Sequence, residues 1–268
     1  MPEGHVLHRL ARRFSHDFAG QSLVVESPQG RFEAGANLVN GSELVGARAH
    51  GKHLFLEFEG ERFVHIHLGL YGKWRFREVH GNLPAPIGQV RLRIASAGEV
   101  ADLAGPNRCA LVSAGEVEGV IARLGPDPLD PTPNARSQFI ANVRGRKRDI
   151  GELVMDQSII AGPGNIYRAE SLFRVGISPF RKGVNTSIKR IGQLWDDLVI
   201  LMEDGVQTGI ITTVDPSDAP NPPLEADPEA SRFYVYHRTG RPCLHCGAPV
   251  QEKRVATRRL FWCPSCQR

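Results

Sequence analysis

The stretch "CLHCGAPVQEKRVATRRLFWCPSC", residues 243–266, decides how the last part of the chain folds. It contains four of the five cysteines, as two Cys-x-x-Cys pairs with sixteen residues between them. This spacing is typical of a zinc site in which four thiolates surround one ion and leave no open position. Two disulfides are the alternative, but the N-terminus lacks the apolar core of a secretion signal, and cytoplasmic disulfides are rare. We therefore expect one structural zinc ion on Cys243, Cys246, Cys263 and Cys266.

Between the cysteine pairs, the chain is expected to run out, turn near Ala256 and Thr257, and return as a β-hairpin. Arg258 and Arg259 then lie just past the tip, where a guanidinium could bind a phosphate. Residues 231–268 carry eight Lys and Arg against one acid, Glu252. Solvated surface arginines are the alternative, but this charge excess favours a polyanionic partner.

Upstream of the hairpin lies "AGPGNIYRAE", residues 161–170, a Gly-Pro-Gly turn that opens a helix at Asn165. Glycines and backbone amides at a helix start form an anion site, and Asn165 adds a side-chain donor. A plain corner between two helices is the alternative.

Helical spacing also covers 149–159 and 186–205, with Gly205 expected to end the last helix. The Pro-rich segment 125–134 is expected to be a linker, which makes 135–230 a helical domain.

The first part of the chain has a different pattern. Apolar residues at helical spacing predict an amphipathic helix over 4–18. Six short segments rich in branched residues then predict an antiparallel sandwich or barrel, over 21–27, 43–49, 53–58, 62–68, 89–95 and 98–103. "SAGE" at 113–116 resembles a capping box that starts a further helix. We expect residues 1–124 to form one α+β domain.

Pro2 and Glu3 stand directly behind Met1. If Met1 is removed, Pro2 offers a secondary amine, and a terminal amine titrates near 8, so part of it is neutral at physiological pH. Such an amine can form an iminium with an electrophilic carbon, and Glu3 is close enough to transfer protons. An accident of helix entry is the alternative reading of these two residues.

Other candidates in this domain are weaker by themselves. Lys52 in "HGKHLFLEF" precedes an apolar strand, where most lysines are solvated. His65 and His67 share a strand face, and without a third ligand we expect ordinary strand histidines rather than a metal site. Leu70 and Tyr71 lie between two glycines, which suits an exposed apolar wedge or a buried turn.

Bulk properties exclude few classes of protein. The 268 residues carry a net charge of +4, and no apolar run approaches the roughly 18 residues of a membrane span. We expect a cytoplasmic, nucleoid-associated protein with no membrane partner.

Four motifs together, "MPEGH", "GKHLF", "AGPGNIYRAE" and "RRLFWCPSCQ", resemble the formamidopyrimidine-DNA glycosylase/endonuclease VIII family, and the endonuclease VIII branch more closely. The resemblance spans the whole chain. It implies an N-terminal β-sandwich, a helix–two-turn–helix domain and a zinc-finger hairpin, in a monomer that binds damaged double-stranded DNA. The purine-specific branch probes the opposite base with a loop that bears an arginine and a phenylalanine, whereas the corresponding region here, "LAGPNRCA" at 103–110, has no aromatic residue.

The resemblance also implies a role for each site residue. Pro2 would be the nucleophile and Glu3 the proton donor and acceptor, while Lys52 would contact a phosphate. Asn165 and Arg258 would bind phosphates beside the everted nucleotide. Leu70 and Tyr71 would fill the gap that it leaves.

Two functions follow from these motifs. The first is a bifunctional glycosylase and abasic-site lyase that excises oxidised bases, pyrimidines favoured, and cuts by β,δ-elimination. The second is a non-catalytic zinc-finger protein that binds nucleic acid with the same fold. The joint presence of Pro2, Glu3 and Lys52 favours the enzyme.

Overall fold

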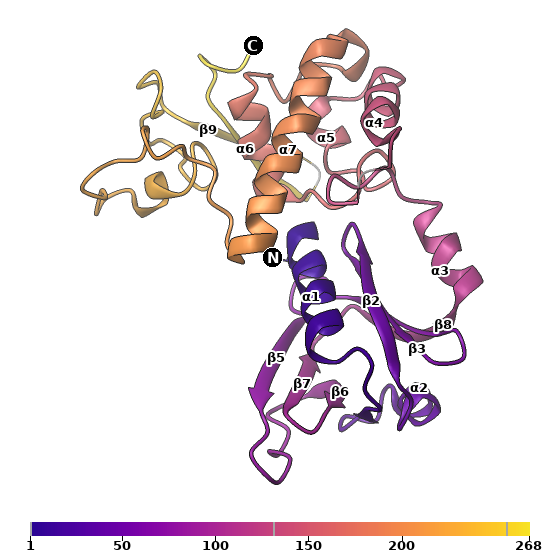
Figure 1. Ribbon diagram of the computed structural model, residues 1–268. Helices are drawn as coiled ribbons and strands as arrows, with labels where there is room; N and C mark the ends of the chain where they lie inside the picture. Colours follow the sequence, from indigo (N-terminus) through magenta and orange to yellow (C-terminus); the bar gives the residue numbers. More distant parts are fainter. Residues whose placement is uncertain (1, 131, 256) are drawn as a thin grey trace. The chain divides into compact units, whose positions relative to one another are not determined.

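The computed structural model describes residues 2–130, 132–255 and 257–268. The chain divides into two compact units, Met1–Arg123 and Leu124–Arg268 (Figure 1). Each unit has its own apolar core, so each is described by itself.

Unit 1 is a helix packed on a β-sandwich. Its helices are α1 (Gly4–Asp17), α2 (Glu33–Val39) and α3 (Ala114–Ile121). Its strands are β1 (Val24–Glu26), β2 (Leu44–His50), β3 (His53–Phe58), β4 (Arg62–His67), β5 (Lys73–Glu78), β6 (Val90–Ala95), β7 (Glu99–Ala104) and β8 (Arg108–Ser113). They form two antiparallel sheets, in the orders β1-β6-β7-β5 and β2-β3-β4-β8. The expected sandwich and N-terminal helix are therefore confirmed.

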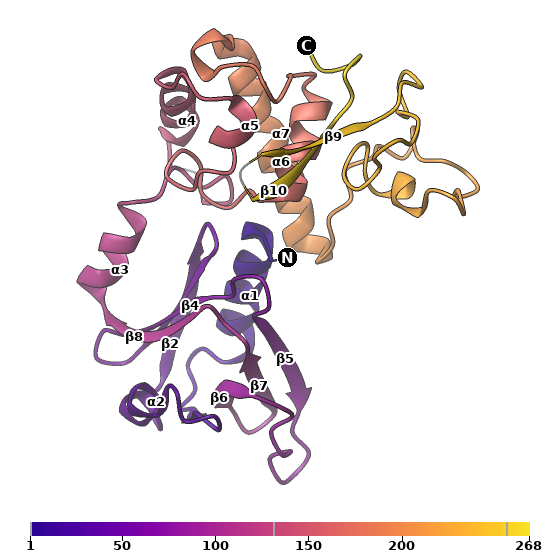
Figure 2. The same ribbon diagram turned by 180° about the vertical axis from the view of Figure 1, so that it is seen from behind.

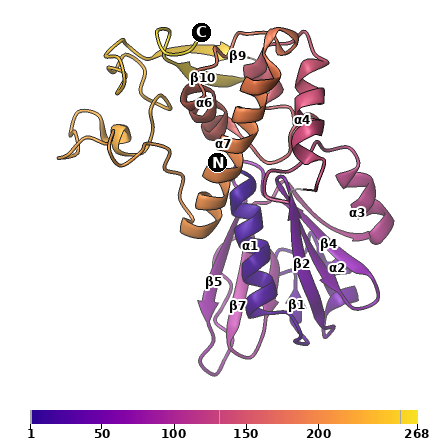
Figure 3. The same cartoon turned by 45° about the horizontal axis from the view of Figure 1, so that its top comes forward.

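The main core of unit 1 lies between the two sheets and beneath α1. Alternation along β3 and β4 sends Leu54, Leu56 and Ile66 inward, and all three are fully buried. Figure 3 shows α1 lying along β2, and its Phe14 ring contacts Trp74 edge-on at 4.8 Å between centroids. A smaller cluster around Phe55 packs beneath α3 on the opposite face of the second sheet.

Unit 2 is helical and ends in a two-stranded hairpin. Its helices are α4 (Ala135–Arg144), α5 (Ile150–Leu153), α6 (Asn165–Arg174), α7 (Ile188–Thr208), and the 3₁₀ turns η1 (Gly183–Asn185) and η2 (Pro228–Ser231). The hairpin pairs β9 (Gln251–Val255) with β10 (Arg258–Trp262), and β10 lies beside α6 (Figure 2). The expected turn at Ala256 falls outside the described residues.

The Pro-rich segment after Leu124 begins inside unit 2. Gly125 N–H donates to Gln157 O at 2.8 Å, and Ala161 N–H donates to Pro126 O at 3.0 Å. Gly125, Pro126 and Asp127 are buried. The start of segment 125–134 is thus held by the turn that precedes α6.

Three local expectations need correction. Strands β5 and β8 were not predicted, although "KWRFRE" alternates charged and aromatic residues as a half-buried strand does. Helix α5 has four residues only, so most of 149–159 is a turn. Helix α7 passes through Gly205 and ends at Thr208, where Gly209 takes the left-handed φ of 80° that stops a helix.

The capping box of α3 is confirmed. Ser113 Oγ accepts from Glu116 N, and the Glu116 carboxylate accepts from Ser113 N at 2.8 Å. Among the described residues, no helix has the length and apolarity to cross a membrane.

Candidate functional site

The start of α1 presents Pro2 and Glu3. Glu3 is the N-cap residue, with extended backbone at φ −113° and ψ 178°, and its side chain is buried. It makes no capping hydrogen bond to α1, whereas its carbonyl accepts from Val6 N at 3.0 Å. A carboxylate here is favoured by the positive end of the helix dipole. Pro2 is half-buried, just outside the first helical turn.

His5, in the same helical turn, is also buried. Burial lowers the pKa of His5 to about 4, so its imidazole is neutral at physiological pH. No role was predicted for His5 from the sequence, because a single histidine in a helix does not by itself indicate a functional site.

Lys52 lies in the tight turn between β2 and β3. The turn passes through Gly51 at φ 57° and closes where His50 and His53 pair across the strands. Burial lowers the pKa of His67, and the positive charge of Lys52 adds to that shift. Lys52 and His67 therefore lie near the same end of the sheet.

The turn between β4 and β5 carries Leu70 and Tyr71. Leu70 is 49% exposed and Tyr71 is 84% exposed, so the buried-turn alternative does not describe them. Gly69 has φ +65°, and a Cβ there would lie 2.8 Å from Cβ of Asn107. A Cβ on Gly72 would lie 2.3 Å from Leu68 O. Both flanking glycines are required for this tight, projecting turn.

In unit 2, Asn165 begins α6 after the Gly-Pro-Gly turn and is buried. Its amide Nδ2 donates to Arg259 O at 2.9 Å, and its Oδ1 accepts from the buried Arg168 guanidinium. Arg168 also donates to Arg259 O at 3.1 Å. These contacts fix the Asn165 amide against the backbone of the hairpin.

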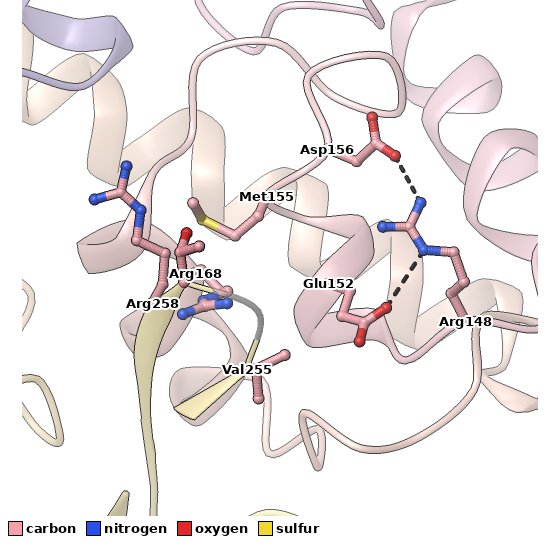
Figure 4. Close-up of a pocket in the computed structure, with 8 residues that line it drawn as sticks. Arg148, Glu152, Met155, Asp156, Arg168, Val255 and Arg258 are labelled. Carbon is pink, nitrogen blue, oxygen red and sulfur yellow. Dashed lines mark hydrogen bonds and ion pairs between the residues drawn. The ribbon is translucent and has the colours of Figure 1, made fainter. Parts of the chain in front are cut away.

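Arg258 lines a cavity of about 360 Å³ at the tip of the hairpin (Figure 4). Figure 4 shows Arg148 on the other side of this cavity, paired with Asp156 at 2.7 Å and with Glu152 at 3.4 Å. The neighbouring Arg259 instead pairs with Glu252 across the hairpin, Nε to Oε1 at 3.2 Å. The cavity is lined by Arg148, Glu152, Met155, Asp156, Arg168, Val255, Thr257 and Arg258.

The contact of Arg168 with Asn165 was not predicted from the sequence. Arg168 lies one helical turn after Asn165, on the same face of α6, and this spacing could have indicated it.

The four cysteines of 243–266 come together. Their sulfur atoms lie within 4.8 Å of one another, with Cys243 to Cys266 at 3.9 Å and Cys246 to Cys263 at 3.5 Å. Four thiolates about 2.3 Å from one zinc ion would be about 3.8 Å apart. The Ala248 backbone N–H lowers the pKa of Cys246 to about 7, whereas burial raises the pKa of Cys243 and of Cys266. This geometry fits a zinc ion.

Cys109 lies apart from this cluster, at the start of β8. It is half-buried against the sandwich core, and burial raises its pKa to about 12. The thiol is therefore unreactive.

Known proteins resemble the chain over its whole length. The model described as formamidopyrimidine-DNA glycosylase N-terminal domain matches residues 1–109, and the corresponding H2TH domain matches residues 124–217. Endonuclease 8 1 of Mycobacterium tuberculosis is 46% identical over 270 residues, all of both chains. Formamidopyrimidine-DNA glycosylase of Xanthomonas axonopodis pv. citri is 30% identical over 278 residues, again all of both.

A solved structure has the same fold. Formamidopyrimidine-DNA glycosylase of Lactococcus lactis, bound non-covalently to DNA with an abasic site, superimposes with a TM-score of 0.81. The two proteins share 23% sequence identity, and the match covers 99% of each chain.

Proposed function

Because the chain belongs to the formamidopyrimidine-DNA glycosylase/endonuclease VIII family, we propose that it is a bifunctional DNA glycosylase and abasic-site lyase of the endonuclease VIII branch. The observation that carries this proposal is 46% identity to an endonuclease 8 over the full length, against 30% to a formamidopyrimidine-DNA glycosylase. The branch assignment favours oxidised pyrimidines as the lesions removed.

Pro2 and Glu3 would carry the chemistry. The Pro2 nitrogen attacks C1′ of the damaged nucleotide, the bond from C1′ to the base breaks, and the sugar opens to an iminium. Glu3, buried at the helix start, transfers the proton that sugar opening requires. Loss of a C2′ proton then expels the 3′ phosphate, and a further proton loss expels the 5′ phosphate. Met1 must be removed first, because an acylated nitrogen has no lone pair to offer; Met1 lies outside the described residues.

The remaining site residues would hold the DNA. Lys52 contacts a phosphate from the β2–β3 turn, and Leu70 and Tyr71 occupy the gap left by the everted nucleotide. In unit 2, Asn165 and Arg258 bind backbone phosphates.

We assign residues 135–230 to the helix–two-turn–helix domain and 231–268 to the zinc hairpin. The partner is damaged double-stranded DNA, bound by a monomer beside the nucleoid in the cytoplasm.

Zinc would be held by Cys243, Cys246, Cys263 and Cys266 as a structural ion. Four thiolates leave no position for substrate, so the ion would supply folding energy to the hairpin and take no part in catalysis. Metal analysis of protein purified without chelator should find one zinc per chain, and its absence would contradict this assignment.

The experiment that tests the function uses duplexes with one oxidised pyrimidine, one 8-oxoguanine or one abasic site. We expect strand cleavage, strongest on the pyrimidine lesion among the damaged bases, and a covalent adduct at residue 2 after borohydride reduction. Glu3→Gln should lower base removal by roughly 10²- to 10⁴-fold and still cut a pre-formed abasic site.

Two controls address the alternatives. A Met1-retaining, tagged N-terminus should not trap, and equal trapping by this protein would move the nucleophile to another residue, with Lys52 next in line. The non-catalytic alternative predicts binding without cleavage of any of the three duplexes.

A further inference from the structure

One segment of unit 2, residues 215–232, contains the 3₁₀ turn η2 and otherwise neither helix nor strand (Figure 1). From Asp215 to Glu229 it carries five acidic residues and no basic one. Such a composition gives a segment little tendency to fold by itself. Two of its carboxylates, those of Asp218 and Asp227, bind residues of the zinc hairpin. We call residues 218–227 the strap.

Asp218 is the first anchor of the strap. The Tyr234 hydroxyl donates to Asp218 Oδ2 at 2.7 Å, and His245 Nε2 lies 3.0 Å from the same oxygen. An ionised carboxylate only accepts, so His245 Nε2 is the donor. The hydrogen bonds from Tyr234 and His245 hold the pKa of Asp218 below its usual value, which keeps this carboxylate ionised. Ala219, the next residue, packs against the apolar cluster that contains Cys243.

His245 links this anchor to the candidate metal site. It stands between Cys243 and Cys246, in the first Cys-x-x-Cys pair. Its ring packs against Phe173 of α6 and against Tyr234, with centroids 5.1 and 4.9 Å apart. Because both cysteines of the pair would bind the ion, bound zinc would fix the backbone that carries this imidazole. The metal site and the donor of the first anchor therefore share one short stretch of chain.

Asp227 is the second anchor, and it is built differently. Arg238 Nε donates to Asp227 Oδ1 at 3.3 Å, and Arg238 Nη2 donates to Asp227 Oδ2 at 2.8 Å. The side chains of this pair are 0% and 8% exposed, whereas those of His245 and Asp218 are 45% and 34% exposed. Water competes more strongly for the exposed pair, so the first anchor is the one that opens more easily.

Between the anchors, residues 221–226 are all exposed, so the position of the strap depends on its two ends. We propose that the pair of Asp218 and His245 couples the strap to the metal site: bound zinc holds the Asp218 end closed, and the closed strap in turn strengthens zinc binding. Such a coupling is reciprocal by thermodynamic necessity. The inference rests on the zinc assignment made under the proposed function, and it does not depend on the DNA reaction.

The test uses the full chain with zinc bound. Equilibrium competition with the zinc indicator 4-(2-pyridylazo)resorcinol measures the zinc affinity. Hydrogen exchange followed by mass spectrometry measures the protection of the Ala219 amide, which donates to Asp215 O at 3.1 Å beside the first anchor. The Asp227 amide, which donates to Leu224 O at 3.1 Å, is the internal reference at the second anchor.

Asp218→Ala should lower the zinc affinity roughly two- to fivefold, the effect of losing a partly exposed ion pair, and should speed exchange at Ala219 but not at Asp227. His245→Phe keeps the ring packing without a ring nitrogen and should reproduce both effects. The double variant should lose no more than either single variant. Glu225→Ala is the matched control, because it removes one acidic side chain from the exposed part of the strap, and it should change neither measurement.

Three results would overturn the inference. Wild-type zinc affinity in both Asp218→Ala and His245→Phe would show that the strap and the metal site are independent. An equal loss of affinity in Glu225→Ala would reduce the effect to net charge. Protein purified without chelator that holds no zinc would remove both the zinc assignment and the coupling. Failure to cleave damaged DNA would contradict the proposed glycosylase alone, because neither measurement uses DNA.

Discussion

Arg258 and Arg259 are adjacent in the sequence, and only their surroundings distinguish them. Arg259 faces Glu252 across the hairpin, which lowers the pKa of that carboxyl and neutralises the arginine charge. Arg258 is half-buried beside the cavity that also contains Arg168. Strand alternation alone could not choose between them, because the partner acid is set by the hairpin register, Glu252 opposite Phe261.

We therefore predict different effects of two neighbouring substitutions. Arg258→Ala should weaken binding to all DNA sequences alike and flatten the salt slope by roughly 0.9, because a phosphate contact carries no base identity. Arg259→Ala should change the slope less, since its charge is already paired. Titrations of one duplex at several salt concentrations measure both, and a larger effect from Arg259→Ala would exchange the two roles.

At the scale of one turn, Leu70 and Tyr71 project from a loop whose glycines admit no side chain. Burying a leucine-sized side chain contributes about 1.5–3 kcal/mol. Leu70→Ala should therefore lower turnover on duplex DNA roughly tenfold, with a smaller effect on a single strand, which has no stack to fill. Parallel assays on the two substrates measure this difference. Equal losses on both would show that the turn only supports the fold.

Glu170 on helix α6 binds the backbone of residues 234–236, the segment that precedes the zinc hairpin. Its buried carboxylate accepts from the backbone N–H of Tyr234, Val235 and Tyr236 at 2.7–2.9 Å, and from Thr213 Oγ1 at 2.5 Å. Burial raises the pKa of Glu170, and these four donors act against that shift. One carboxylate thus fixes three consecutive residues of a segment that has no regular structure.

Glu170→Gln should loosen that segment. An amide has one acceptor oxygen, so its NH₂ group would face backbone N–H groups and leave buried donors unsatisfied, at about 1–3 kcal/mol each. We expect a lower melting temperature for unit 2 and weaker DNA binding, with zinc content retained. Glu152→Gln is a control, since that carboxylate lies at the cavity rim in an exposed pair. Equal melting temperatures for the wild type and Glu170→Gln would contradict this account.

The elements that could be predicted from the sequence are those with local signals. The Cys-x-x-Cys pairs, the Ser113 capping box and the apolar spacing of 4–18 each depend on neighbours within a few residues. Strand β5 also has a local signal that was overlooked, since Trp74 and Phe76 alternate with charged residues. The sequence does not show the partner of its Arg77, which donates to Asp102 on the neighbouring strand β7 at 2.7 Å.

At the scale of the whole molecule, the predicted site residues are divided between two units with separate cores. Local motifs indicated Pro2, Glu3 and the cysteines, because their chemistry is visible in adjacent residues. The hydrogen bonds that join Arg108 to His65 and His65 to His53 could not be predicted, since they depend on the register of three strands brought together from 55 residues of chain. Long-range register is the property that a single sequence conveys least.

Because the two cores are separate, we expect the free energy of unfolding of unit 1 to fall at acidic pH independently of unit 2. His5 and His65 are buried with pKa values of about 4, and His53 has a pKa of about 3, whereas each titrates near 6.5 in the unfolded chain. Below pH 6.5 the unfolded state therefore binds more protons than the folded state. Stability is complete above pH 6.5 and is lost as the pH falls toward 4, by up to about 1.4 kcal/mol per pH unit for each buried histidine.

Trp74 can report this transition without interference from the zinc site, which has its own acid dependence. Trp195 and Trp262 lie in unit 2, so Trp195→Phe/Trp262→Phe leaves one tryptophan, in unit 1. Urea unfolding followed by its fluorescence at pH 7.5, 6.5, 5.5 and 5.0 should give a free energy that falls by about 0.4 kcal/mol per buried histidine between the first two values and declines steeply below. Adding His65→Asn should reduce the slope of that decline by about 1.4 kcal/mol per pH unit, whereas the exposed His80→Asn should leave it unchanged. A decline that is equally steep with and without His65 would show that other groups bind the protons that unfold unit 1.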